Sequence, residues 1–121
     1  MNGYKDLQVY QESKRLAVEV HRMSMNLPKH EMFEEGSQIR RSSKAVTSLI
    51  IEGFGRRKYN ADYVRYLILS HAECDETILH LEFLYDCKSL QDETIYRTLK
   101  SAYVELSRKI YGFLNWVEDN G

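Results

Sequence analysis

Four long segments of the chain repeat apolar residues at intervals of three and four, and only short connections separate them. The clearest repeat comprises Ile95, Leu99, Ala102, Leu106, Ile110, Phe113 and Val117. Such spacing places side chains on one face of an α-helix. We predict helices over about residues 6–27, 37–55, 61–89 and 92–118 of a single domain, 1–121. Short connections favour antiparallel neighbours, so the expected fold is an all-α, up-down-up-down four-helix bundle.

The composition supports a helical protein that needs no cross-link. One Pro and six Gly in 121 residues are too few for the frequent turns of a sandwich or barrel. Cys74 and Cys87 fall on one predicted helix, about 20 Å apart, which is too far for a disulfide. The opening residues lack an apolar run, and no segment has eighteen consecutive apolar residues. We therefore expect a reduced, cytoplasmic protein with no membrane partner.

The second predicted helix carries two stripes of residues. Its main stripe is Ile39, Ser43, Val46, Ile50 and Phe54, which suits the core. The second stripe lies on the other side and consists of Gln38, Ser42, Ala45, Leu49 and Glu52. A helix with two such faces is often buried on both. We predict that the second stripe contacts another subunit.

Glu52 lies on this second stripe, beside a glycine that permits a close approach of backbones. A carboxylate in such a position should be paired. We expect Arg40 or Arg41 to be its partner on a neighbouring element.

The charges are segregated along the chain although they nearly cancel overall. The formal net charge of −1 excludes a globally basic coat. Residues 36–58 hold six bases and one acid, whereas residues 73–93 hold seven acids and one base. Two interpretations follow. In the first, the basic helix pairs with the acidic helix, either within one chain or across a subunit contact. In the second, the basic segment binds phosphate.

A cluster of bases and aromatic residues follows the second predicted helix. Arg56, Arg57 and Lys58 precede Tyr59, Tyr63, Arg65 and Tyr66. Cations interleaved with aromatic rings suit backbone contact and base stacking on single-stranded nucleic acid. Tyrosines at the corner of a bundle are also ordinary packing residues.

The sequence offers little for catalysis or metal binding. The densest group of ligand types is His71, Glu73, Cys74, Asp75, Glu76 and His80, but no Glu-x-x-His pair of a di-iron bundle is present. Arg65 and His71 fit the loose Arg-x(4–6)-His pattern of ribonucleases of the HEPN type, in which the His acts as a general base. Six helical residues rotate these two side chains about 120° apart. We expect no metal, no cofactor, no small-molecule substrate and no enzymatic activity.

Several motifs together resemble a known family. They are Gln38-Ile39-Arg40-Arg41-Ser42, Ile51-Glu52-Gly53-Phe54-Gly55-Arg56-Arg57, the opening Tyr4-Lys5-Asp6-Leu7-Gln8-Val9-Tyr10, and Ala72-Glu73-Cys74-Asp75-Glu76. With these motifs, nearly the whole chain resembles the four-helix-bundle proteins encoded by intervening sequences inside bacterial 23S ribosomal RNA genes. Leu49 is a departure, because many members carry Asn before the Glu-Gly pair.

The resemblance implies a fold and an assembly more than an activity. The family is similar to the accessory protein of diversity-generating retroelements, which forms a homopentamer and binds nucleic acid through a basic surface. This implies that the chain is a homopentamer that binds RNA or DNA. The candidate nucleic-acid positions implied here are Arg40, Arg41, Lys44, Arg56, Arg57 and Lys58. The alternatives are a structural scaffold whose charges serve assembly only, and a HEPN-like ribonuclease.

Overall fold

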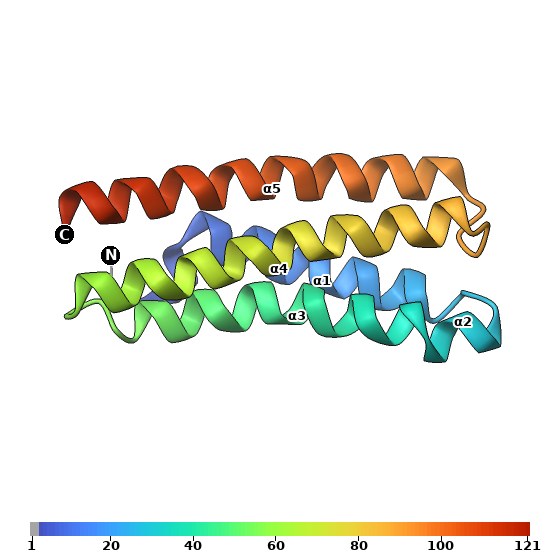
Figure 1. The fold of residues 1–121 in the computed structure, drawn as a ribbon, viewed down its shortest axis with the longest axis horizontal. Helices are drawn as coiled ribbons and strands as arrows, with labels where there is room; N and C mark the ends of the chain where they lie inside the picture. The colour runs from blue at the N-terminus through green and yellow to red at the C-terminus, as the bar shows by residue number, and fades with distance from the viewer. Residues whose placement is uncertain (1–2) are drawn as a thin grey trace.

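The computed structural model describes residues 3–121, and Met1 and Asn2 of the opening segment lie outside the described residues. Within that range the chain forms a short 3-10 helix and five α-helices without any strand, which confirms the all-α prediction (Figure 1). The elements in chain order are η1 (Tyr4–Asp6), α1 (Gln8–Ser24), α2 (Lys29–Phe33), α3 (Glu35–Phe54), α4 (Asn60–Asp86) and α5 (Glu93–Asn120).

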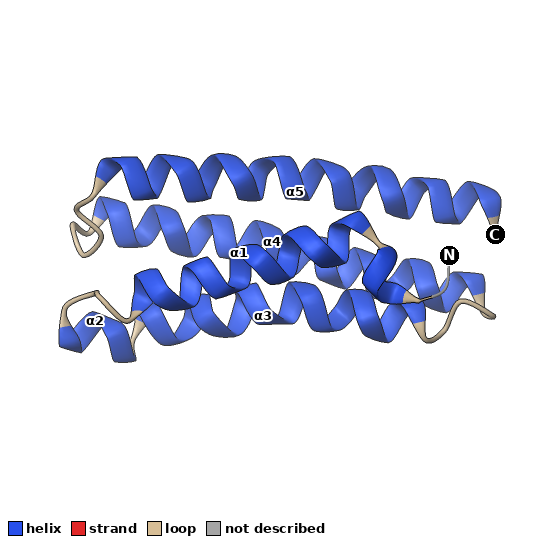
Figure 2. Cartoon of the chain, turned by 180° about the vertical axis from the view of Figure 1, so that it is seen from behind, coloured by secondary structure: helices blue, strands red, loops and turns tan. Residues whose placement is uncertain are grey.

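The four long helices lie side by side, and their order around the bundle follows the chain. Helix α1 packs against α3 and α5, and α4 packs against the same two helices. Hence α1 and α4 lie diagonally opposite each other. Figure 1 views the bundle with α4 in front of α1, and Figure 2 shows the same bundle from behind, with α1 in front. The colours in Figure 1 show that successive long helices run in opposite directions.

The core contains most of the apolar residues that the periodicity assigned to the inner faces, but Ile95 at the start of α5 is 40% exposed. Ile39, Val46 and Ile50 of α3 are fully buried, as are Leu106 and Ile110 of α5. Buried hydroxyls are satisfied between helices. Ser70 Oγ donates to the Val46 carbonyl oxygen at 2.7 Å. Because buried polar groups without partners are costly, this bond helps to fix the register of α3 against α4.

Gly53 allows a close approach of these two helices. A Cβ at this position would lie 3.0 Å from the Cβ of Tyr66 and 3.2 Å from Cδ1 of Tyr63. Both distances are shorter than ordinary van der Waals contact. The glycine is therefore required by packing between α3 and α4, near the end of α3.

Several helix ends differ from the prediction. Helix α1 begins at Gln8, because Asp6 belongs to η1, and it ends at Ser24 rather than near Leu27. The connection between the first two predicted helices, residues 28–36, contains α2, and α3 already begins at Glu35. Helix α4 ends at Asp86, and Lys88 follows with a φ of 65°, in the left-handed region. That conformation ends the helix earlier than the apolar pattern suggested.

Asn60, the first residue of α4, bonds to the end of α5. Its side chain makes no capping bond, and its Nδ2 donates instead to the Val117 carbonyl oxygen at 2.8 Å. It thus satisfies a carbonyl in the last turn of α5, where helices leave such groups unpaired. At the other end of α5, Asp92 is the cap, and its carboxylate accepts from the Ile95 amide at 3.1 Å.

None of the helices within residues 3–121 is both long enough and apolar enough to cross a bilayer.

Candidate nucleic-acid interface

Three consecutive bases occupy the corner between α3 and α4. The corner is closed by backbone hydrogen bonds, including Arg56 N to the Gly53 carbonyl and Tyr59 N to the Arg56 carbonyl. Arg57, Lys58 and Tyr59 are exposed, and Arg56 is half-buried. The chain therefore presents its densest run of positive charge at one end of the bundle.

Arg56 is held by a carbonyl and an aromatic ring. Its Nη1 donates to the Glu52 carbonyl oxygen at 2.8 Å, and its Cζ lies 4.4 Å from the centre of the Tyr66 ring. The Cζ of Arg65 lies 4.7 Å from the same ring. Two guanidinium groups therefore contact one tyrosine, an arrangement that cation–π attraction favours.

Arg57 is held in the same way, and Lys58 lies beside a ring. Arg57 Cζ lies 3.5 Å from the centre of the Phe54 ring, and its Nη1 donates to the Phe54 carbonyl at 2.9 Å. Lys58 Nζ lies 5.8 Å from the ring of Tyr59, which is 63% exposed. Within residues 3–121, no carboxylate forms an ion pair with Arg56, Arg57 or Lys58. Their charge is available to an external anion.

We call this group the corner cluster. It comprises Arg56, Arg57, Lys58, Arg65 and Tyr66. Arg65 also pairs with Asp62 at 3.3 Å, so its charge is partly neutralised. Burial raises the pKa of the neighbouring Tyr63 hydroxyl to about 12, with a smaller opposing effect from Arg57, so this tyrosine is neutral at pH 7.

The other three predicted nucleic-acid residues do not join the corner cluster. Arg40 and Arg41 lie near the opposite end of α3, roughly 22 Å from Arg56 by helix geometry. Arg40 is half-buried, and it donates to Ser24 Oγ and to the Met32 carbonyl, both at 2.9 Å. These bonds connect α3 to α1 and α2. The structure therefore gives Arg40 a structural role.

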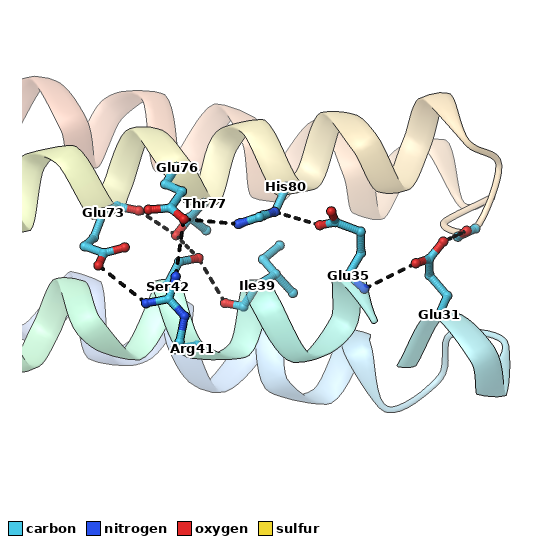
Figure 3. A network of polar contacts seen from close by, with 10 residues as sticks. Glu31, Glu35, Ile39, Arg41, Ser42, Glu73, Glu76, Thr77 and His80 are labelled. Atoms are coloured by element: carbon cyan, nitrogen blue, oxygen red, sulfur yellow. Dashed lines mark hydrogen bonds and ion pairs between the residues drawn. The ribbon is translucent and has the colours of Figure 1, made fainter. Parts of the chain in front are cut away.

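Arg41 pairs with acids of α4, which is the cis pairing that the charge segregation suggested. Its guanidinium lies 3.7 Å from Glu73 Oε2 and 3.3 Å from Glu76 Oε1 (Figure 3). Burial raises the pKa of the Glu73 carboxyl, as does Glu76 to a lesser extent, while Arg41 opposes the shift. The guanidinium thus balances two carboxylates and is not free for phosphate.

Lys44 lies on a different side of α3 and is the third residue outside the cluster. Its Nζ is 3.2 Å from His21 Nδ1 of α1. In residues 3–121 it forms no ion pair with a carboxylate. Its charge is available, but on the α1 side of the bundle.

The predicted subunit-contact stripe is divided between surface and core. Gln38 and Glu52 are exposed, and Ala45 and Leu49 are half-buried. Ser42 is completely buried, and its hydroxyl lies 2.8 Å from Thr77 Oγ1 of α4. Ser42 therefore belongs to the contact between α3 and α4 and is not available to another subunit.

The expected pairing of Glu52 is wrong. Arg40 and Arg41 are both bonded elsewhere, and only the backbone carbonyl of Glu52 accepts from Arg56. Since the Glu52 side chain is exposed, water solvates its carboxylate and no buried partner is needed.

The residues considered for catalysis are held apart from one another. Arg65 pairs with Asp62, whereas His71 Nε2 lies 3.0 Å from Ser107 Oγ of α5. The described residues contain no group of three or more His, Cys, Asp or Glu side chains arranged to hold a metal ion. Cys74 is buried, and burial raises the pKa of its thiol to about 12, so it is not a nucleophile at neutral pH.

The sequence grouped Tyr66 with the corner bases as a ring for base stacking, but it did not predict that Tyr66 contacts the guanidinium groups of Arg56 and Arg65. The spacing of ten residues from Arg56 to Tyr66 crosses a helix break, so no helical rule pairs the two residues. The only available signal was the interleaving of cations and aromatic residues after Gly55.

Comparison with known proteins identifies the family. The family model for the 23S rRNA-intervening sequence protein matches residues 5–112 of this chain. Because the match covers most of the chain, the protein belongs to that family. No curated protein matches the chain significantly.

Proposed function

We propose that this chain is a non-catalytic, self-associating protein that binds RNA or DNA through the corner cluster. The observation that carries the proposal is the set of three adjacent cations, Arg56, Arg57 and Lys58. Rings and carbonyls hold the two arginines, Lys58 lies beside a ring, and none of the three is paired with a carboxylate within residues 3–121. Membership of a family named for 23S rRNA intervening sequences is compatible with a role alongside RNA.

The mechanism is electrostatic contact combined with stacking. Guanidinium and ammonium groups bind phosphates and release counterions, which makes the affinity depend on salt. The exposed ring of Tyr59 and the half-buried ring of Tyr66 lie beside these cations and are suited to stack on unpaired bases. One corner provides few contacts. Several copies in one assembly, each with its own corner, would bind a long strand much more tightly.

Self-association is supported by the apolar surface that the monomer leaves exposed. Ile68 is 51% exposed, Leu79 is 46% exposed and Phe83 is 45% exposed, and all three are on α4. A contact that removes these side chains from water would be favourable. A homopentamer is the assembly that we propose for this chain.

The absence of catalysis is part of the proposal, and the positions of Arg65 and His71 support it. Arg65 is bonded within its own helix to Asp62, while His71 bonds across to α5. Each side chain thus has a partner of its own in the fold, and neither is bonded to the other. Cleavage of a labelled transcript by the wild-type protein would overturn this part of the proposal.

The decisive experiment reverses the corner charges. Arg56→Glu with Arg57→Glu should abolish retention of single-stranded RNA in a low-salt filter assay and leave the assembly mass unchanged in light scattering. The matched control is Arg97→Glu with Arg108→Glu, which makes the same charge change at exposed sites on α5. The control should retain RNA.

The alternative function is a structural scaffold whose charges serve assembly only. The contacts of Arg41 with Glu73 and Glu76 favour it, because they show basic and acidic segments pairing within the fold. The scaffold predicts that the corner reversal breaks the assembly and that the wild type binds no RNA. Either result would replace the proposed function with this alternative.

A further inference from the structure

We propose that a cleft between α1 and α3 binds a small amphipathic anion, a molecule that carries one carboxylate on an apolar chain. The inference goes beyond nucleic-acid binding and self-association and depends on neither. It is drawn from the size, the apolar lining and the unpaired cations of the cleft. Figure 2 shows the bundle from the side of α1, with α3 beside it.

The cleft has the size and the apolar lining of a small-molecule site. Its volume is about 480 Å³, and Ala17, Val18 and Ile51 are among the residues that line it. Thr47 also lines it, but Thr47 Oγ1 already donates to Ser13 Oγ at 2.9 Å, so its proton is used within the fold. Clefts of roughly 300–1,000 Å³ with mainly apolar walls and a few polar groups are typical binding sites for small molecules.

The two ends of the cleft differ in character. Because α1 and α3 run in opposite directions, Tyr10 and Ile51 line one end. The other end is lined by His21, Arg22 and Lys44. From Tyr10 to Arg22 the wall formed by α1 is about 18 Å long by helix geometry. A bound molecule would therefore extend its apolar chain towards Tyr10 and place its carboxylate beside Lys44.

Lys44 and His21 provide hydrogen-bond donors at the polar end. Lys44 Nζ lies 3.2 Å from His21 Nδ1. Since an ammonium group can only donate, Nδ1 is the acceptor, and the proton of the neutral imidazole is on Nε2. The Lys44 ammonium and the His21 Nε2–H are both donors. Donors of this kind form strong, charge-assisted hydrogen bonds with a carboxylate.

The cations around the cleft have no counter-charge within the fold. Lys14, Arg22 and Lys44 line the cleft, and no Asp or Glu of residues 3–121 does. None of the three cations forms an ion pair with a carboxylate in the described part of the chain. Positive charge beside an apolar surface favours an anionic ligand and disfavours a cationic one.

The extent of the cleft favours a small molecule over a second copy or another protein. Nine residues line the cleft, whereas a stable protein interface takes about 20–30 residues from each partner. The wall formed by α3 runs from Lys44 to Ile51, which is about two helical turns. An occupant that fills only this cleft therefore has the size of a ligand.

Calorimetric titration of the full chain with sodium decanoate tests this site. One decanoate should bind per chain. At the same concentrations acetate, which lacks the apolar chain, and decyltrimethylammonium, which has the opposite charge, should not bind. Lys44→Gln should weaken the binding of decanoate about tenfold or more, because it removes a charge-assisted hydrogen bond. The matched control is Lys29→Gln, which changes an exposed lysine of α2 outside the cleft and should keep the wild-type affinity.

A second pair of variants tests the apolar wall. Val18→Glu places a carboxylate at the cleft and should abolish the binding of decanoate. Leu79→Glu makes a similar change on α4, outside the cleft, and should retain the binding, because Val18 is 43% exposed and Leu79 is 46% exposed. All four variants should have the helical circular dichroism spectrum of the wild type.

Several results would overturn the proposal. They are a wild type that does not bind decanoate, equal binding of decanoate and decyltrimethylammonium, and an unchanged affinity in Lys44→Gln or Val18→Glu. Light scattering during the titration tests the remaining occupant. An assembly mass that falls as decanoate is added would assign the cleft to a contact between copies and would contradict a free ligand site. None of these results bears on RNA binding at the corner cluster.

Discussion

His80 Nδ1 of α4 lies 2.6 Å from Oε2 of Glu35 in the first turn of α3 (Figure 3). The imidazole is nearly buried, with 11% of its side chain exposed, whereas Glu35 is 29% exposed. Its other nitrogen, Nε2, has no hydrogen-bond partner in the described chain, although Glu76 Oε1 is 3.5 Å away. The bond to Glu35 therefore provides most of the hydrogen bonding that offsets the burial of the His80 imidazole between the helices.

The first prediction concerns this bond. Glu35→Ala should lower the free energy of unfolding by about 1–3 kcal/mol, because it leaves a nearly buried imidazole without its partner. Glu34→Ala is the matched control, since Glu34 is exposed and adjacent, and it should change the value by less than about 0.5 kcal/mol. Urea unfolding followed by circular dichroism measures both. Equal effects of the two substitutions would contradict the role given to Glu35.

The second prediction compares two glycines. Gly53→Ala should destabilise the fold by about 1–3 kcal/mol, because the new Cβ would meet Tyr66 Cβ at 3.0 Å. Gly112→Ala in α5 should stabilise it by about 0.5–1 kcal/mol, since no atom lies within 4 Å of the added carbon and alanine favours a helix. Thermal unfolding of the two variants should give shifts of opposite sign, and shifts of the same sign would refute the close approach at Gly53.

The third prediction follows from the pKa of Glu73. Burial raises this pKa above its ordinary value, so the folded protein holds the proton more tightly than the unfolded chain does. The protonated Glu73 side chain makes its full contribution to stability when the pH is below the pKa of Glu73 in the unfolded chain. This contribution is lost as the pH rises through the pKa of Glu73 in the folded protein. The amide introduced by Glu73→Gln does not titrate. Hence the stability of this variant relative to the wild type should increase from about pH 4 to pH 7. A difference that does not change with pH would contradict this prediction.

The fourth prediction distinguishes the two thiols. Cys87 is exposed, whereas Cys74 is buried and burial raises its pKa to about 12. At pH 8 a thiol reagent should modify Cys87 quickly and Cys74 only after unfolding. Cys87→Ser should therefore abolish the fast reaction in the folded protein. Two fast thiols in the wild type would show that the core around Cys74 is open.

Apolar periodicity predicted the long helices well because burial of one face dominates their formation. It did not predict their ends. Asn60 resembles a cap by residue type, but its amide bonds to the Val117 carbonyl 57 residues away. Similarly, Lys88 ends α4 through its backbone conformation, although the apolar pattern continues to Leu90, which is buried. Local rules do not include such tertiary contacts.

The candidate site was predictable where charge lies in an exposed turn, and less so within helices. Arg56, Arg57 and Lys58 follow the last residues of α3, and a corner leaves their charge accessible. Arg40 looks equivalent in sequence, but its partners Ser24 and Met32 come from segments whose packing no spacing rule indicates. Charge alone does not tell an accessible arginine from one that connects helices.

The corner cluster makes a quantitative claim about phosphate contacts. The most direct test is the salt dependence of binding to a single strand of about ten nucleotides, short enough for one corner to cover. Replacing Arg56 by Ala should reduce the slope of log K against log salt by about 1, as the loss of one phosphate contact requires. The slope of Arg97→Ala should equal that of the wild type. An unchanged slope for Arg56→Ala, or wild-type binding that does not depend on salt, would contradict the account.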